Sequence, residues 1–375
     1  MGGDPTPTTA TATSSARWRP SRRTIVVTAL VVVVVALWLL SGRLVGFAVV
    51  ADGLGFDVPR PMAADVEREQ VHLGDIEVDR YTPDGDPQAT TDQPAILLVP
   101  GATPAGRDDG RVVDIAEAVA AAGRTVVVPE LEVYDEDLVP EDLDRLVAVT
   151  STLADGHGTV TLAGFSFGGS LALVASADDR LDGQVALVAT FGAYGDLAGV
   201  AQAATTGVSL VDGERIPWEP DPRAAEVVRD QLLGLLDDED AAAVAEVLAD
   251  ERDRSELSAE LRAVHDLAVH DDPERTEELV VGAPSVVRER IEAVSPLRAG
   301  GDLDARVVAL HARDDPVIPF GELRRLEAGF EQLDARTLVT FDHVGLDDEE
   351  DQGWWVTVRD LWTISGFVHE LLDAS

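Results

Sequence analysis

Between residues 95 and 190 the chain alternates short apolar runs with segments of helical periodicity, and this pattern limits its possible folds more than any other feature. Each run is only four to seven residues long, which suits a buried strand rather than a helix. Parallel strands need crossover connections, and helices normally supply them. The alternation therefore predicts an α/β fold, with a mostly parallel sheet covered by helices on both faces. The expected strands are 95–99, 125–128, 159–163 and 184–190, and the expected helices are 111–122, 141–154 and 168–177.

The pattern changes on either side of this region. Residues 66–81, interrupted at Gly74 and Asp75, predict a two-stranded hairpin. Residues 196–300 show no strand pattern, only helical pieces separated by Pro- and Asp-rich joints. We therefore expect an α/β domain over 65–375 with a helical insertion at about 196–300. The later strands are predicted at 306–311 and 336–341, and the later helices at 222–236, 240–249, 255–269, 285–294, 320–330 and 354–372.

The first 64 residues differ from the rest. Residues 1–23 are rich in Thr, Ser, Ala and Pro, carry four arginines, and are predicted to form a disordered basic tail. Residues 24–41 are predicted to form a transmembrane helix, because the uncharged run from Thr24 to Leu40 spans about 25 Å as a helix. Residues 42–64 are predicted to be a linker. The positive-inside rule places the N-terminus in the cytoplasm and the α/β domain outside it.

Cleavage and export is the alternative to an uncleaved anchor. Residues 21–26 read Ser-Arg-Arg-Thr-Ile-Val, which resembles a twin-arginine export signal, and residues 49–51 offer a cleavage site. The apolar run is longer than the 7–15 residues usual in a signal peptide. The anchor is therefore the preferred interpretation.

Composition excludes several kinds of chemistry. The chain has 70 acidic residues against 29 basic ones, all of them arginine, and has no cysteine. Without lysine or cysteine there is no Schiff base, thiol nucleophile, thiolate metal site or disulfide. The net charge of −41 argues against a nucleic-acid partner, because such binding needs basic side chains that neutralise phosphates.

One motif carries the candidate chemistry. The predicted strand 159–163 runs into Gly-Phe-Ser-Phe-Gly-Gly at residues 164–169, and a predicted helix follows. The pattern G-x-S-x-G between a strand and a helix places a serine on a sharp turn, with its hydroxyl exposed at the end of the sheet. Ser166 is therefore the candidate nucleophile.

With this motif in this setting, the chain resembles the α/β-hydrolase superfamily, whose triad runs Ser, acid, His along the chain. The segment Asp314-Asp315-Pro316-Val317 is similar to the family's acid loop, and the resemblance selects Asp315, with Asp314 as the alternative. His343, after the predicted strand 336–341, matches the place of the family's catalytic histidine.

The resemblance also implies an oxyanion hole. Its two donors would be the backbone N–H groups of Phe167 and Ala102. Pro100 departs from the family pattern, which usually has histidine at that place. The loop 103–110, which holds Arg107, is either a rim of the pocket or a solvated turn. The insertion occupies the place of the family's cap domain. Segment 191–197 looks specific in sequence, but no role follows from it.

The resulting expectation is a membrane-anchored serine hydrolase, esterase- or lipase-like, that cleaves a small-molecule ester through an acyl-enzyme. No cofactor and no metal are expected. An acyltransferase or haloperoxidase-like activity on the same fold is one alternative, and a catalytically silent membrane-tethered binding module is another. The sequence sets neither the ester nor the oligomeric state.

The acidity predicts adaptation to high salt. A GC-rich genome explains the missing lysine but not the 70 carboxylates. At 1 M ionic strength the Debye length falls to about 3 Å, so the repulsion between carboxylates is screened. We expect the melting temperature to rise steadily from dilute buffer to molar NaCl, as followed by circular dichroism. A melting temperature that stays flat or falls over that series would contradict salt adaptation.

Overall fold

The computed structural model describes residues 65–84, 93–135, 141–301, 303–340 and 354–374. The chain divides into two compact units, Met1–Leu44 and Val45–Ser375, and every described residue belongs to the second. The predicted basic tail, transmembrane helix and linker lie outside the described residues, as does His343. Within the described ranges, no helix has the length and apolar character needed to cross a membrane.

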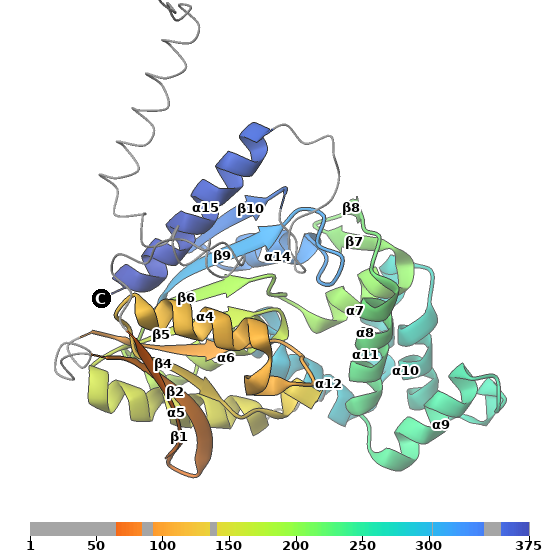
Figure 1. Ribbon diagram of the computed structural model, residues 1–375. Coiled ribbons are helices and arrows are strands. Elements are labelled where there is room, and N and C mark those ends of the chain that lie inside the picture. Colours follow the sequence, from red (N-terminus) through yellow and green to blue (C-terminus); the bar gives the residue numbers. More distant parts are fainter. Residues whose placement is uncertain (1–64, 85–92, 136–140, 302, 341–353, 375) are drawn as a thin grey trace, which may run out of the picture. The chain divides into compact units, whose positions relative to one another are not determined.

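An eight-stranded sheet forms the centre of the fold, in the order β1-β2-β4-β3-β5-β6-β9-β10 (Figure 1). Strands β1 and β2 form the predicted hairpin around Gly74 and Asp75, and β2 also runs antiparallel to β4. All other neighbours are parallel, as the alternation predicts. This strand order is that of the α/β-hydrolase fold. The strands are β1 (Val66–Leu73), β2 (Ile76–Pro83), β3 (Ala95–Val99), β4 (Val126–Pro129), β5 (Val160–Phe165), β6 (Val185–Phe191), β9 (Arg306–Ala312) and β10 (Leu333–Leu338).

Helices cover both faces of the sheet and create two separate apolar cores. On one face, α5 (Glu141–His157) and α6 (Phe167–Ser176) pack Leu146 and Leu171 against the strands. On the other, α4 (Gly110–Ala121) and α15 (Trp354–Asp373) contribute Val119 and Phe367. The central strand β3 is buried along its whole length. Burial on both faces explains the continuous apolar runs in the sequence.

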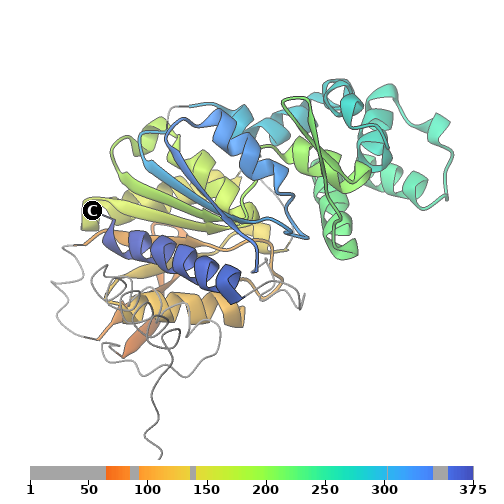
Figure 2. The ribbon, with the colours of Figure 1, turned by 90° about the horizontal axis from the view of Figure 1, so that it is seen from above.

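The segment between β6 and β9 is mainly helical, and its helices gather beside one end of the sheet (Figure 2). After α7 (Leu197–Thr206) and a short hairpin come α8 (Pro222–Gly234), α9 (Asp238–Leu248), α10 (Ala259–Val269), α11 (Thr276–Gly282), α12 (Ser285–Val294) and α13 (Pro296–Ala299). Helix α14 (Gly321–Gly329) follows later, between β9 and β10.

The prediction that residues 196–300 contain no strand is wrong. Strands β7 (Val208–Val211) and β8 (Glu214–Pro217) form an antiparallel pair. Asp212 and Gly213 connect them, and both have positive φ, 49° and 81°. Such a two-residue turn matches the twist of the flanking strands, and Asp-Gly is a strong hairpin signal. The strands are too short to produce an obvious apolar alternation.

The last strand also differs from its prediction. The sequence predicts a strand at 336–341, whereas β10 is Leu333–Leu338, in parallel register with β9 from Val307 to Ala312. β10 lies at the edge of the sheet, and only Leu338 within it is buried. An edge strand has a weak apolar pattern, so its position follows pairing with β9 rather than its own residues.

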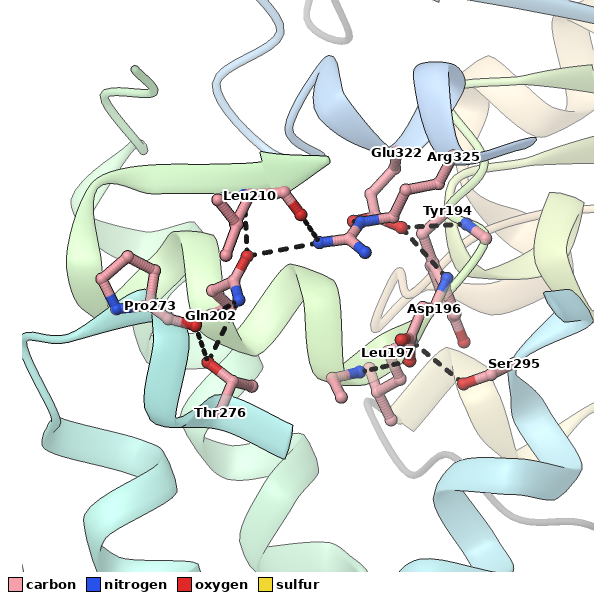
Figure 3. A network of polar contacts seen from close by, with 12 residues as sticks. Tyr194, Asp196, Leu197, Gln202, Leu210, Pro273, Thr276, Ser295, Glu322 and Arg325 are labelled. Atoms are coloured by element: carbon pink, nitrogen blue, oxygen red, sulfur yellow. Dashed lines mark hydrogen bonds and ion pairs between the residues drawn. The ribbon is translucent and has the colours of Figure 1, made fainter. Parts of the chain in front are cut away.

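Segment 191–197 connects the end of β6 to α7 and so joins the sheet to the helical insertion (Figure 3). Tyr194 is fully buried, and its hydroxyl donates to the Val294 carbonyl at 3.0 Å. Its backbone exchanges two hydrogen bonds with the Ser170 hydroxyl, both 2.9 Å long, on helix α6. The Leu197 N–H donates to Ser295 Oγ. These contacts fix α7 and α12 to α6.

Glu322 of α14 completes this junction from inside the protein. Its buried carboxylate accepts hydrogen bonds from the backbone N–H groups of Gly195, at 3.1 Å, and Asp196, at 3.0 Å. Arg325 lies beside it with Nε 3.0 Å from Glu322 Oε1, and the same guanidinium donates to the Leu210 carbonyl in β7. Burial raises the pKa of Glu322 to about 7, and the Arg325 charge opposes that rise.

The buried Glu322 predicts a pH-dependent stability. Its pKa in the folded protein lies above the unfolded value of 4.5, so its contribution is complete below about pH 4.5 and is lost as pH rises through about 7. Glu322→Gln keeps an acceptor for the two N–H groups but does not titrate. We therefore expect the wild type to lose more melting temperature between pH 5 and 8 than this variant does, by about 2 °C or more.

The matched control is Glu327→Gln, on the exposed side of the same helix. It should follow the wild-type pH profile. Parallel profiles for wild type and Glu322→Gln would show that Glu322 does not titrate in this way.

Candidate active site

Ser166 occupies a strained turn between β5 and α6. Its backbone has φ 53° and ψ −128°, and a positive φ is uncommon for a residue other than glycine. Helix α6 begins at the next residue, and the Ser166 side chain makes no capping hydrogen bond to it. The Ser166 N–H donates to the Phe191 carbonyl at 2.9 Å, which holds the turn against β6. A strained polar residue whose hydroxyl does not cap the helix is typical of a functional position.

Close packing of backbone explains the glycines around Ser166. A Cβ atom on Gly164 would lie 2.5 Å from the Gly169 Cα atom, and a Cβ on Gly168 would overlap the Pro100 carbonyl. Neither glycine has room for a side chain, because β5, α6 and the turn after β3 meet here. The glycines therefore allow the turn to place the serine at the carboxyl end of the sheet.

The turn after β3 lies directly against Ser166. A Cβ atom on Gly101 would lie 2.8 Å from Ser166 Cβ and 3.5 Å from its hydroxyl oxygen. Ala102, the next residue, is partly exposed, and Phe167 is buried at the N-terminus of α6. The first N–H groups of a helix have no partner within it and carry partial positive charge. The structure therefore brings both predicted oxyanion donors into the neighbourhood of Ser166.

Asp315 and Asp314 differ sharply in their surroundings. Asp315 is 1% exposed, and its Oδ1 accepts hydrogen bonds from the N–H groups of Val317, at 2.9 Å, and Ile318, at 3.0 Å. Asp314, by contrast, is exposed. His311 is buried beside the loop, with Nε2 3.0 Å from the Ile318 carbonyl and 3.7 Å from Asp315 Oδ2. Burial and fixed orientation are what a triad acid needs, and they favour Asp315.

A residue that the sequence analysis missed holds this loop from the other side. Trp218, just after β8, donates its indole N–H to the Asp315 carbonyl at 2.6 Å. A backbone bond from Asp221 N to Pro316 O, 2.8 Å long, lies next to it. The insertion thus contacts the loop of the candidate acid. No signal in the sequence pairs Trp218 with a residue 97 positions away.

His343 itself lies outside the described residues, but the chain leading toward it is well fixed. The buried Asp360 of α15 accepts hydrogen bonds from the N–H groups of Val339 and Thr340, both at 2.7 Å. Burial opposes ionisation of Asp360, but these bonds outweigh it and hold its pKa below the ordinary value. Asp360 therefore secures the end of β10, from which the chain continues toward residue 343.

Loop 103–110 contains an internal ion cluster. Arg107 is buried and contacts three carboxylates, with Nη1 2.8 Å from Asp79, Nη2 2.5 Å from Glu77 and Nε 2.5 Å from Glu130. Arg107 is therefore buried, although Pro104, Ala105, Asp108 and Gly110 of the same loop are exposed. Its three contacts tie the loop to β2 and to the end of β4. Among the described residues, no group of His, Asp and Glu is arranged to hold a metal ion.

Known structures with a similar chain trace include three enzymes of low sequence identity to this chain. One is a serine hydrolase from the polyaromatic hydrocarbon-degrading bacterium Cycloclasticus zankles, with 14% identity, a TM-score of 0.42, and 82% of this chain and 98% of that chain covered. Another is 2-hydroxy-6-oxo-6-phenylhexa-2,4-dienoate hydrolase from Rhodococcus sp. strain RHA1, with 16% identity, a TM-score of 0.43, and coverages of 83% and 99%. An esterase of the bacterial hormone-sensitive lipase family has 15% identity, a TM-score of 0.46, and coverages of 84% and 86%.

No protein-family model and no curated protein matches the sequence. The strand order and the turn at Ser166 define the fold.

The contact between Gly101 and Ser166 predicts a strong effect of one methyl group. Gly101→Ala would place a Cβ 2.8 Å from Ser166 Cβ, so the serine or the turn must move. A displacement of about 1 Å at a reacting group costs about 100-fold in rate, and we expect a loss of that size in kcat on an activated ester. The control is Gly156→Ala in α5, where an added Cβ meets no atom within 4 Å. Full activity in Gly101→Ala would contradict the assignment of this turn to the site.

Proposed function

We propose that this chain is a serine hydrolase that cleaves carboxylic esters through Ser166, His343 and Asp315. The observation that carries the proposal is the Ser166 turn, with a positive φ, no capping role for the hydroxyl, and the Gly101 turn packed against it. Strain of this kind is kept where a side chain must be presented in a fixed direction. The buried and oriented Asp315 supports the same assignment.

The reaction proceeds in two steps. His343 accepts the hydroxyl proton as Ser166 Oγ forms a bond to the ester carbonyl carbon, and the bond to the alcohol oxygen then breaks. His343 gives its proton to the departing alcohol, which leaves an acyl group on Ser166. His343 then accepts a proton from water as the water oxygen attacks the acyl carbonyl carbon. The bond to Ser166 Oγ breaks, His343 returns the proton to Ser166, and the acid is released. Asp315 orients His343 and stabilises its protonated form.

The negative charge of the tetrahedral intermediate needs preorganised donors. The backbone N–H groups of Phe167 and Ala102 are proposed for this role. Their neighbourhood supports the proposal, because Phe167 begins helix α6 and Ala102 follows the glycine that faces Ser166. Arg107 supports this arrangement by fixing the loop that continues from the turn.

The helical insertion is proposed to be a cap over the site. Its hairpin reaches the acid loop through Trp218, and α7 joins the junction with α6 through Leu197 and Tyr194. Leu232, Val264 and Leu267 give it an apolar interior. A cap of this kind excludes water and shapes the pocket for the acyl or alcohol group.

The proposed location is the outer side of a cell membrane. It depends on the predicted transmembrane helix at 24–41 and on the four arginines that precede it. Detection of the mature protein only in the soluble extracellular fraction, starting near Asp52, would favour export and cleavage instead.

A covalent serine probe tests the enzyme assignment. We expect a fluorophosphonate to label the full chain in molar NaCl, and the labelling to disappear in Ser166→Ala. Ser285→Ala is the control, because this serine is exposed at the start of α12. A wild-type chain that is folded but takes no label would favour the silent binding module. An excess of transfer product when an alcohol is added would favour an acyltransferase.

A further inference from the structure

The loop at residues 313–320 carries Asp315 between the end of β9 and the start of α14. Within this loop, Asp315 Oδ1 accepts hydrogen bonds from the backbone N–H groups of Val317 and Ile318. His311 of β9 lies with Nε2 3.0 Å from the Ile318 carbonyl. These contacts fix the carboxylate relative to the loop and to β9.

The carbonyl groups of Asp315 and Pro316 are held by the helical insertion. Trp218, which follows β8 directly, donates its indole N–H to the Asp315 carbonyl at 2.6 Å. The Asp221 N–H donates to the Pro316 carbonyl at 2.8 Å. Because Pro316 confines the backbone of Asp315 to extended conformations, a displaced carbonyl moves the whole aspartate. Two consecutive residues of the loop therefore depend on one short segment of the insertion.

Trp218 is itself held in place by the β7–β8 hairpin. Its backbone N–H donates to the Gly207 carbonyl at 2.8 Å. The Leu210 N–H donates to Gln202 Oε1 at 2.8 Å, and Arg325 donates to the Leu210 carbonyl at 2.6 Å (Figure 3). The hairpin is thus bonded to α7 and to α14, the helix that follows the acid loop.

We propose that Trp218 is a positioning residue for ester hydrolysis and that it acts through Asp315. The inference rests on the proposed role of Asp315 as the acid of the triad. An aspartate side chain is short, so its carboxylate follows any displacement of its backbone. Catalytic groups have to stay within about 0.5 Å of their productive positions. The insertion therefore contributes to the geometry of the triad as well as to the cover of the pocket.

The indole N–H, rather than the bulk of the ring, carries this role. An indole nitrogen is a donor only, and its partner is the Asp315 carbonyl. Two substitutions separate the N–H from the bulk. The nitrogen-bearing ring of tryptophan is close in size to imidazole, so Trp218→His keeps an N–H near this place and loses the second ring. Trp218→Phe keeps an apolar ring and loses the N–H.

The kinetic constants of these two variants test the proposal, measured on the full chain in molar NaCl with an activated ester. We expect Trp218→Phe to lower kcat about tenfold while KM changes by less than about twofold, because the triad is disturbed and ester binding is not. Trp218→His should keep kcat within about threefold of the wild type, because the hydrogen bond is retained. A role in packing alone predicts the opposite order, with phenylalanine tolerated better than histidine.

Arg215→Gln is the matched control on the same hairpin. Arg215 is exposed on β8 and pairs with Glu274, away from the acid loop. Its kcat and KM should equal those of the wild type. The melting temperature of each variant reports whether the domain is folded. If Trp218→Phe does not fold, a kcat of Trp218→His near that of the wild type supports the proposal, and a loss of about tenfold or more opposes it.

The failure of this role and the failure of the proposed function give different results. A wild type with neither ester turnover nor a fluorophosphonate label on Ser166 would refute the proposed function, and the role of Trp218 with it. In an active wild type, an unchanged kcat in Trp218→Phe would overturn the role of Trp218 alone. So would a kcat in Trp218→Phe above that in Trp218→His. A raised KM at constant kcat would also overturn it, because Trp218 would then contact the substrate.

Discussion

Three backbone segments approach one another closely at Ser166, and this contact positions the candidate site. The end of β5, the start of α6 and the turn after β3 meet without room for a single methyl group at Gly164 or Gly168. The serine between them adopts a positive φ because the chain must reverse there within one residue. The order of the strands then decides what else reaches the same edge, namely the acid loop after β9 and the chain that follows β10.

The residues around this turn are fixed by groups that do not themselves react. Arg107 holds the loop after the Gly101 turn, and Asp360 holds the end of β10. Trp218 bonds to the acid loop from the helical insertion. Glu322 ties the insertion to the body of the domain through the backbone at residues 195 and 196. Preorganised sites depend on such supporting contacts, because a reacting group that moves by an ångström loses most of its effect.

Much of the central sheet could be predicted from the sequence, because strands buried on both faces appear as uninterrupted apolar runs. Ser166 could be found because a sharp turn requires glycines at fixed spacing. The edge strand β10 was misplaced, since its position follows pairing with β9 rather than its own pattern. The hairpin at Asp212 and Gly213 has a local signal in this Asp-Gly pair, but its strands are too short to show an apolar alternation. The contacts of Trp218 and Glu322 have no local signal, because they link residues 97 and 127 positions apart.

The mass of the acylated protein distinguishes a reactive Ser166 from an inert one. The wild-type chain, mixed with a slowly hydrolysed activated ester and stopped by acid, should carry one acyl group. After cleavage at arginine, that group should be found on the peptide from residue 146 to residue 180, which contains Ser166. Ser166→Ala should show neither the adduct nor ester turnover. An adduct on another peptide, or turnover that persists in Ser166→Ala, would contradict this expectation.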